Sequence, residues 1–124
     1  MMHWLAIALG GALGSLLRFA CVSYLTPLFN LRFPVGTFVV NMIGSLLIGI
    51  AYVILVEKSA PLEWRLFFIT GVLGGFTTFS AFSVELLQLW QSGHVFHAFV
   101  YAVGSVILGL TMAFAGMLLT QKFI

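Results

Sequence analysis

The sequence predicts an all-α integral membrane protein of four transmembrane helices, and its composition and the spacing of its charges both lead to this fold class. Hydrophobic residues make up 62% of the 124 residues and charged residues only 6%, whereas roughly a quarter of a soluble domain is charged. The runs 33–56, 66–84 and 86–121 carry no charge, and a membrane-spanning helix needs about 20 mostly apolar residues. These observations exclude an ordinary soluble enzyme and predict a multi-pass protein of the cell (inner) membrane, surrounded by lipid.

Turn-forming residues divide the chain into four helices joined by short connections. The first helix ends before Thr26, the second has Pro34 in its first turn, where proline fits well, and residues 57–61 form a polar link. Residues 1–17 contain no Lys or Arg, which a signal peptide needs, so we expect the first helix to be retained. The whole chain (1–124) is expected to be a single four-helix transmembrane domain with antiparallel neighbours, with helices over residues 4–25, 34–56, 62–90 and 95–122.

The positive charges are divided almost evenly between the two ends of the predicted bundle. Lys58, Arg65 and Lys122 lie at the end that carries both termini, whereas Arg32 and Arg18 lie toward the other. Such a balance gives almost no positive-inside bias, so the chain can insert both ways and pair as an antiparallel, dual-topology homodimer. The alternative is that one charge suffices to set a single orientation. The net charge of +2 is too small and scattered to suggest nucleic acid.

Small residues recur four apart along every predicted helix. At this spacing helix backbones can approach closely in lipid. With 13 glycines in the chain, chance pairs are the alternative. The pairs are Gly10/Gly14, Gly11/Ser15, Ser45/Gly49, Gly71/Gly75 and Ser105/Gly109.

The middle of the third helix is the most unusual segment. Gly74 and Gly75, followed by the β-branched Thr77 and Thr78, make a poor helix interior. A break here would free backbone carbonyls, which are tolerated at membrane depth only where they line a cavity or bind an ion. Such carbonyls suit a hard cation such as Na⁺. The alternative is a continuous helix whose hydroxyls bond back to its own backbone.

Two phenylalanines follow this segment at helical spacing. Phe79 and Phe82 are three apart and share one helix face, with Ser80 and Ser83 beside them. The edge of an aromatic ring is positive, and ring edges with hydroxyls can replace part of an anion's hydration shell without holding it too tightly. The alternative is that the rings only fill the core or face lipid.

Asn41 is the one strongly polar side chain in the middle of the second helix. An intramembrane polar group is a functional candidate, and its NH₂ group could donate to an anion. The alternative is that it only joins helices. Thr37 and Ser45 lie one turn on either side of Asn41 and extend a polar stripe. Tyr101 and Ser105, four apart in the last helix, could form a similar stripe.

The charged residues inside the spans suggest two further roles. Arg18 lies too deep for a simple helix-end charge, and it could raise the anion concentration in a vestibule, although it could also snorkel to the interface. Glu85 is the one acid inside a span, and it would either be the proton carrier of a coupled exporter or lie near a wet vestibule. His94 and His97 lack a third ligand, so we expect no metal site there. No nucleophile–base pair or cofactor motif appears, so we expect no enzyme.

Three segments together make the chain similar to a known family. It resembles the bacterial fluoride-specific ion channels, the CrcB or Fluc family, over essentially its whole length. The resemblance implies a dual-topology antiparallel homodimer with two fluoride pathways and a central structural Na⁺ held by backbone oxygens. The segments are Gly10–Phe19, Gly36–Ser45 and Gly74–Phe82.

Carried over by position, the resemblance implies roles for individual residues. Gly74 and Thr77 would supply the Na⁺ carbonyls, Phe79 and Phe82 would line the pores, and Asn41 would be the pore amide. Looser candidates for a polar track are Thr78, Ser80, Ser83, Tyr101 and Ser105, and Arg18 matches the family's arginine on the first helix.

Two departures from the family pattern stand out. Ala81 occupies a position that is usually threonine, so one hydroxyl of the track is absent, and Leu46 replaces a common phenylalanine.

The expected function is passive, selective export of fluoride, which lowers the fluoride concentration in the cytoplasm. The partners are the fluoride ion, membrane lipid and a second copy of the chain, with no soluble protein and no nucleic acid. One alternative is a small dual-topology proton-coupled exporter that uses Glu85. A second alternative is a non-transporting assembly protein, which would need no polar stripe.

Overall fold

The computed structural model describes residues 1–29 and 33–124, and every regular element in these ranges is helical. Four helical segments are long and apolar enough to cross a membrane, and they cover Met2–Leu28, Val35–Glu57, Leu62–Gln91 and Val95–Phe123. The four predicted helices are therefore present, with ends within a few residues of those expected. Arg32, which the charge count placed at the end opposite the termini, lies outside the described residues.

The first two spans are each made of two helical pieces. In the first, α1 (Met2–Leu25) continues as a 3₁₀ turn (Thr26–Leu28). The Thr26 hydroxyl donates to the carbonyl of Val22 at 2.7 Å, which helps the chain continue past the predicted stop. In the second span, α2 (Val35–Ala51) continues as a π-helix (Tyr52–Glu57).

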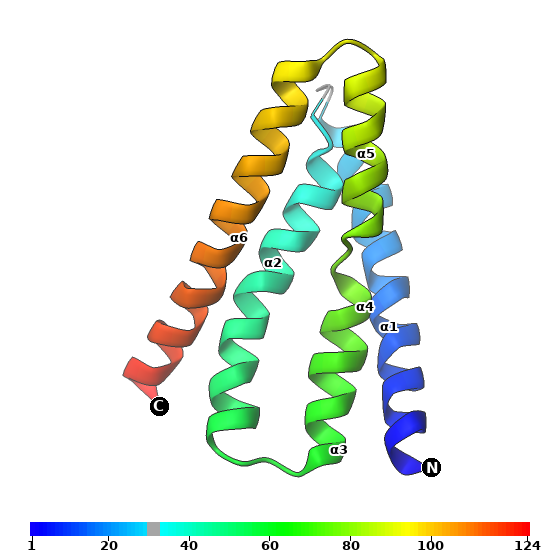
Figure 1. The fold of residues 1–124 in the computed structure, drawn as a ribbon. Helices are drawn as coiled ribbons and strands as arrows, with labels where there is room; N and C mark the ends of the chain where they lie inside the picture. Colours follow the sequence, from blue (N-terminus) through cyan, green and yellow to red (C-terminus); the bar gives the residue numbers. More distant parts are fainter. Residues whose placement is uncertain (30–32) are drawn as a thin grey trace.

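The third span is interrupted and the fourth is continuous. The third consists of α3 (Leu62–Arg65), a π-helical stretch (Leu66–Leu73), α4 (Gly74–Phe76) and α5 (Ser80–Gln91). The fourth is α6 (Val95–Phe123). Figure 1 shows the gap between α4 and α5, with both termini and the link between α2 and α3 at the same end of the molecule.

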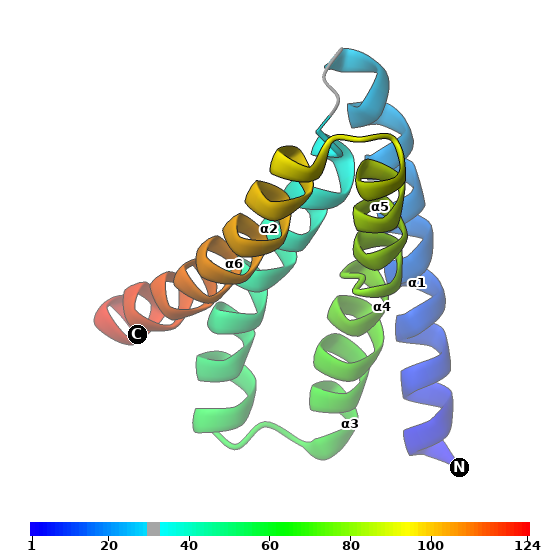
Figure 2. The same cartoon turned by 45° about the horizontal axis from the view of Figure 1, so that its top comes forward.

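The helices pack as two close pairs. α1 lies against the π-helical stretch and α4 of the third span, and α2 lies against α6. Figure 2 shows α6 leaning away from the third span toward its C-terminus. α6 also meets α5 near the turn that joins them. The cavity between α2, the third span and α6 is open on one side.

Glycine makes both close pairs possible. A Cβ atom at Gly14 would collide with the carbonyl of Val72, and one at Gly49 would collide with the carbonyl of Ala113. The spacing of small residues therefore predicted close packing correctly at these positions. Gly11 and Gly104, by contrast, would meet nothing within 4 Å.

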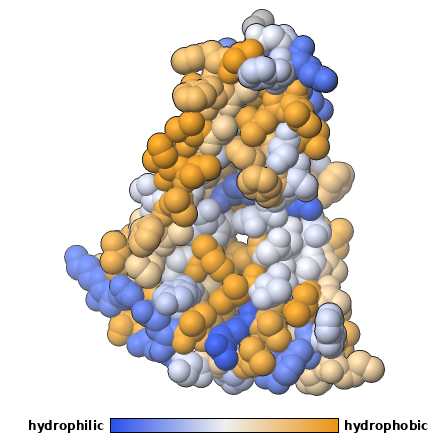
Figure 3. Space-filling view, viewed as in Figure 1, coloured by the Kyte–Doolittle hydropathy of each residue, from blue (hydrophilic) through white to orange (hydrophobic). Residues whose placement is uncertain are grey.

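The surface is largely apolar and the buried core is small. The core cluster consists of Phe82, Leu89, Ala98 and Tyr101. Large hydrophobic side chains are exposed along all four spans, and Figure 3 shows hydrophobic atoms along the flanks with paler, more hydrophilic atoms in the middle of one face. Such an exterior suits hydrocarbon rather than water.

A candidate ion pathway at the broken helix

The break in the third span is centred on Thr77. The helix stops at Phe76, Thr77 is extended with φ −84° and ψ 161°, and the helix resumes at Ser80. The break confirms the prediction made from the paired glycines and threonines, whose low helix propensity favours an interruption. What holds it open is a set of side chains from the chain's own second and first spans.

Asn41 of α2 binds the backbone on the far side of the break at two points. The Thr78 amide donates to Asn41 Oδ1 at 2.9 Å, and Asn41 Nδ2 donates to the Thr78 carbonyl at 3.1 Å. In an uninterrupted helix the Thr78 amide would donate to the carbonyl of Gly74, four residues earlier. The Thr78 amide therefore donates to Asn41 instead of to the Gly74 carbonyl.

The Thr78 hydroxyl has the same effect one turn later. The Ala81 amide donates to Thr78 Oγ1 at 3.1 Å, which caps the start of α5. An uninterrupted helix would direct that amide to the carbonyl of Thr77. The two carbonyls assigned to a cation from the sequence, those of Gly74 and Thr77, have thus each lost their helical donor to a named side chain.

Several hydroxyls at the break are already committed to the backbone. Thr77 Oγ1 donates to the carbonyl of Leu73 at 3.0 Å, and Ser83 Oγ donates to that of Phe79 at 2.9 Å. Hydrogen bonds from a hydroxyl to the carbonyl one turn earlier were expected only if the helix were continuous. They occur on both sides of the interruption. Ser80 Oγ lies 3.3 Å from Thr78 Oγ1.

Arg18 reaches the break from α1. Its Nε atom donates to the carbonyl of Gly75 at 3.1 Å, and the side chain is partly buried. Arg18 is in the lining of neither cavity described below. The structure thus places this arginine on the backbone of the broken helix.

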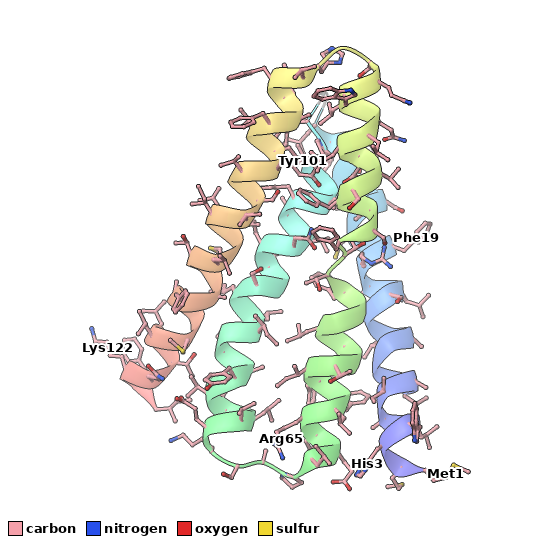
Figure 4. The ribbon with its side chains drawn as sticks, in the orientation of Figure 1. Met1, His3, Phe19, Arg65, Tyr101 and Lys122 are labelled. Atoms are coloured by element: carbon pink, nitrogen blue, oxygen red, sulfur yellow. The ribbon has the colours of Figure 1, made fainter. Side chains whose placement is uncertain are left out.

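The two candidate phenylalanines lie together but in different surroundings. Their ring centroids are 5.6 Å apart, Phe82 is 7% exposed and Phe79 is 78% exposed in the single chain. Phe82 also presents a T-shaped contact to Tyr101, with centroids 4.9 Å apart. Figure 4 shows Tyr101 directed from α6 into the bundle, whereas Phe19 and Lys122 point outward.

A cavity of about 380 Å³ lies between α2, the break and α6 and opens to the outside. Ser105 Oγ, in its lining, is buried and has no hydrogen-bond partner among the described residues. Three predicted residues, Ser80, Ser83 and Tyr101, are not in the lining. The predicted site residues that the cavity does bring together are Asn41, Gly74, Thr77, Thr78, Phe79, Phe82 and Ser105.

A second cavity, of about 400 Å³, lies nearer the end opposite the termini and contains Glu85. Thr37 Oγ1 donates to Glu85 Oε2 at 2.7 Å, and Tyr101 Oη donates to Glu85 Oε1 at 2.9 Å. Thr37 and Tyr101 are 3% and 0% exposed. A carboxylate that accepts a hydroxyl on each oxygen is well satisfied inside a protein.

The sequence arguments missed this Thr37–Glu85–Tyr101 cluster. They placed Tyr101 in a polar stripe, and they placed Glu85 either in a proton-coupled exporter or near a wet vestibule. Thr37 was expected on the polar helix face of Asn41, four residues before it, but it was not paired with Glu85.

Comparison with known proteins gives matches along nearly the whole chain. The family described as "CrcB-like protein, Camphor Resistance (CrcB)" matches residues 5–117. A protein of Saccharophagus degradans named fluoride-specific ion channel FluC is 49% identical over 98% of this chain and 91% of its own length. Proteins with the same name from Thermus thermophilus and Rhizobium meliloti are 48% and 42% identical, over 92% and 100% of this chain and 90% and 100% of their own lengths.

Proposed function

Because this chain belongs to the CrcB-like family of membrane proteins, we infer that it is a fluoride-specific ion channel and not an enzyme. We propose that it lets fluoride leave the cell passively through the inner membrane. The observation that carries this proposal is the cavity at the broken helix, where an amide, a free hydroxyl and two aromatic rings meet inside four apolar spans.

The physical basis is the trapping of a weak acid. Neutral HF crosses a bilayer, dissociates at the pH of the cytoplasm and leaves the fluoride anion inside, because a bare anion crosses hydrocarbon very slowly. A selective channel then lets the anion run down its electrochemical gradient. No coupling to ATP or to another ion is required for this direction of flow.

Asn41 and Ser105 are among the donors that the cavity can offer to an anion. An asparagine NH₂ group has two hydrogens, and the Thr78 carbonyl takes one of them, so the other is available. Ser105 Oγ has no partner among the described residues. The Ser83 hydroxyl donates to the Phe79 carbonyl, and the Tyr101 hydroxyl donates to Glu85. These two hydroxyls can donate to fluoride only if those hydrogen bonds break.

The rings of Phe79 and Phe82 complete the proposed lining. Their positive edges attract fluoride without a full charge, and conduction requires binding that is weak enough for release. Thr78 and Ser80 add hydroxyl oxygens at the start of α5. Arg18 on α1 remains a candidate for raising the anion concentration near the entrance of the pathway.

We propose that two copies of this single four-helix domain, residues 1–124, pair in antiparallel orientation and with dual topology. Phe79 and Gly74 are exposed in the single chain although they lie in the middle of a span. The cavity that they line is open on one side. A second copy would cover these residues and close two symmetric pathways, and the balanced charges at the two ends allow both orientations.

The carbonyls of Gly74 and Thr77 fit a structural Na⁺ at the centre of that dimer. Hard cations are held by oxygen ligands, and these two oxygens have lost their helical donors to Asn41 and to the Thr78 hydroxyl. Two carbonyls from each copy would hold the ion. When bound, it would offset the negative ends of four carbonyl dipoles and fix the two breaks against each other.

The proposal can be tested in cells that lack other fluoride exporters. Cells that express this chain are expected to hold less fluoride after growth in fluoride medium than cells that express the Phe82→Ile variant at an equal membrane level. Equal intracellular fluoride in the two strains and in cells without the protein would contradict the proposed function.

A further inference from the structure

Arg18 is bonded to the backbone immediately before the break. The carbonyl of Gly75 accepts its Nε–H at 3.1 Å, which joins positions 57 residues apart in sequence. This carbonyl belongs to the last turn of a helix that ends at Phe76. The last carbonyls of a helix have no helical partners, and a positive side chain is favourable beside them.

The packing of α1 explains why Arg18 reaches this carbonyl. A Cβ atom at Gly75 would lie 2.7 Å from the carbonyl oxygen of Gly11 and 3.2 Å from the amide of Ser15, so α1 and α4 are in backbone contact. Arg18 follows Gly14 by one helical turn and therefore lies level with the break. A charged group inside a span is costly unless it is paired with another charge or with backbone carbonyls.

The break is thus held from two sides by two different helices. Arg18 of α1 binds Gly75 before Thr77, and Asn41 of α2 binds Thr78 after it. The Thr77 carbonyl lies between these two anchors, and the Gly74 carbonyl lies one residue before the first of them. The directions of both carbonyls therefore depend on the placement of the anchored residues beside them.

We propose that Arg18 is a positioning residue for the cation site. It fixes the end of α4 through the Gly75 carbonyl, and so it sets the directions of the Gly74 and Thr77 carbonyls that would bind Na⁺. Its hydrogen bond matters more to this role than its charge. This inference rests on the proposed function, because the Na⁺ site is part of that proposal.

Three substitutions separate the hydrogen bond from the charge. Arg18→Gln removes the charge but keeps an N–H donor at the same distance along the side chain, because glutamine Nε2 replaces arginine Nε. Arg18→Lys keeps the charge but moves its donor one atom further out. Arg18→Met keeps a similar length and loses both. Lys122→Gln is the matched control, because it removes a charge at the far end of α6.

The readout is the thermal unfolding of the purified protein at a series of Na⁺ concentrations, with K⁺ used to keep ionic strength constant. We expect Na⁺ to raise the unfolding temperature of the unsubstituted protein. The Na⁺ concentration that gives half of this rise should stay within about twofold of the unsubstituted value in Arg18→Gln and Lys122→Gln. In Arg18→Lys and Arg18→Met this concentration should rise roughly tenfold, as expected for loss of one hydrogen bond. If Arg18→Met does not fold, the contrast between Gln and Lys decides alone.

Three results would overturn the inference. Native behaviour of Arg18→Lys with impairment of Arg18→Gln would show that the charge is what matters. Native behaviour of all variants would show that Arg18 does not act on the site, and no Na⁺ stabilisation of the native protein would remove the site itself. Fluoride flux through the native protein is measured separately, so a working channel without Na⁺ stabilisation contradicts only this inference, whereas absent flux contradicts the proposed function.

Discussion

At the scale of single residues, one amide in α2 decides much of the proposed site. Asn41 holds Thr78 at two points and keeps one hydrogen for the cavity, so it is both a helix-joining residue and a candidate anion ligand. The sequence presented these as alternatives. The two hydrogen bonds to Thr78 show that Asn41 joins α2 to the third span. Its remaining amide hydrogen is left for an anion in the cavity.

We expect Asn41→Asp to reduce fluoride flux at least about tenfold. Aspartate can still accept the Thr78 amide, but it cannot donate to the Thr78 carbonyl or to an anion, and it adds a negative charge to the cavity. Fluoride efflux from liposomes measures the effect. Thr111→Ala is the control and should conduct normally, because the Thr111 hydroxyl donates to the carbonyl of Ile107 on its own helix and lies outside the lining of this cavity.

Phe79→Ile and Phe82→Ile should each abolish or sharply reduce fluoride flux while the dimer still assembles. The reason is the loss of a ring edge that stabilises the anion. Because Phe82 is buried within the single chain, Phe82→Ile should also lower the unfolding temperature markedly. Phe96→Ile on α6, where the ring is 74% exposed, is the control. Normal flux in both pore variants would remove the rings from the pathway.

At the scale of elements, the break was predictable but its anchors were not. Two glycines followed by two threonines weaken a helix locally, and this signal needs no knowledge of other helices. The partners of the freed groups lie 37 and 57 residues away, and no local pattern pairs Thr78 with Asn41 or Gly75 with Arg18. The two π-helical stretches were also not predicted, since they satisfy the same hydrophobic pattern as an α-helix.

Close packing between α2 and α6 depends on Gly49. We expect Gly49→Ala to lower the free energy of unfolding by about 1–3 kcal/mol, because the added Cβ would collide with the carbonyl of Ala113 and overpacking costs this much. Chemical denaturation in detergent measures the change. Gly104→Ala is the matched control, because a Cβ at that position would meet nothing within 4 Å. Equal loss in both variants would contradict the contact explanation, because alanine favours a helix more than glycine does and Gly104→Ala should not by itself destabilise the protein.

At the scale of the whole molecule, three features of the single chain support the proposed dimer. Its cavity is open, its central phenylalanine is exposed, and its ends are balanced in charge, which together support a second, inverted copy. The number of helices and their antiparallel order could be deduced from run lengths and turns. The Thr37–Glu85–Tyr101 cluster could not be deduced, because it needs three spans placed relative to one another.

Fluoride movement under a pH gradient distinguishes a channel from a proton-coupled exporter. If the chain is a passive channel, an imposed pH gradient should not drive more fluoride accumulation than in protein-free vesicles, with or without Glu85. Glu85→Gln should lower stability by about 1–3 kcal/mol, because an amide cannot accept hydroxyls from both Thr37 and Tyr101 on two oxygens. Uphill fluoride movement that follows the pH gradient and disappears in Glu85→Gln would instead establish the exporter.

The most direct test of the central claim is efflux from liposomes that contain the purified protein, recorded with a fluoride electrode and, in parallel, with a chloride electrode. The account predicts rapid loss of fluoride while chloride is retained, without an added proton gradient or nucleotide. Retention of fluoride by vesicles that demonstrably contain folded protein, or equal loss of chloride, would contradict it.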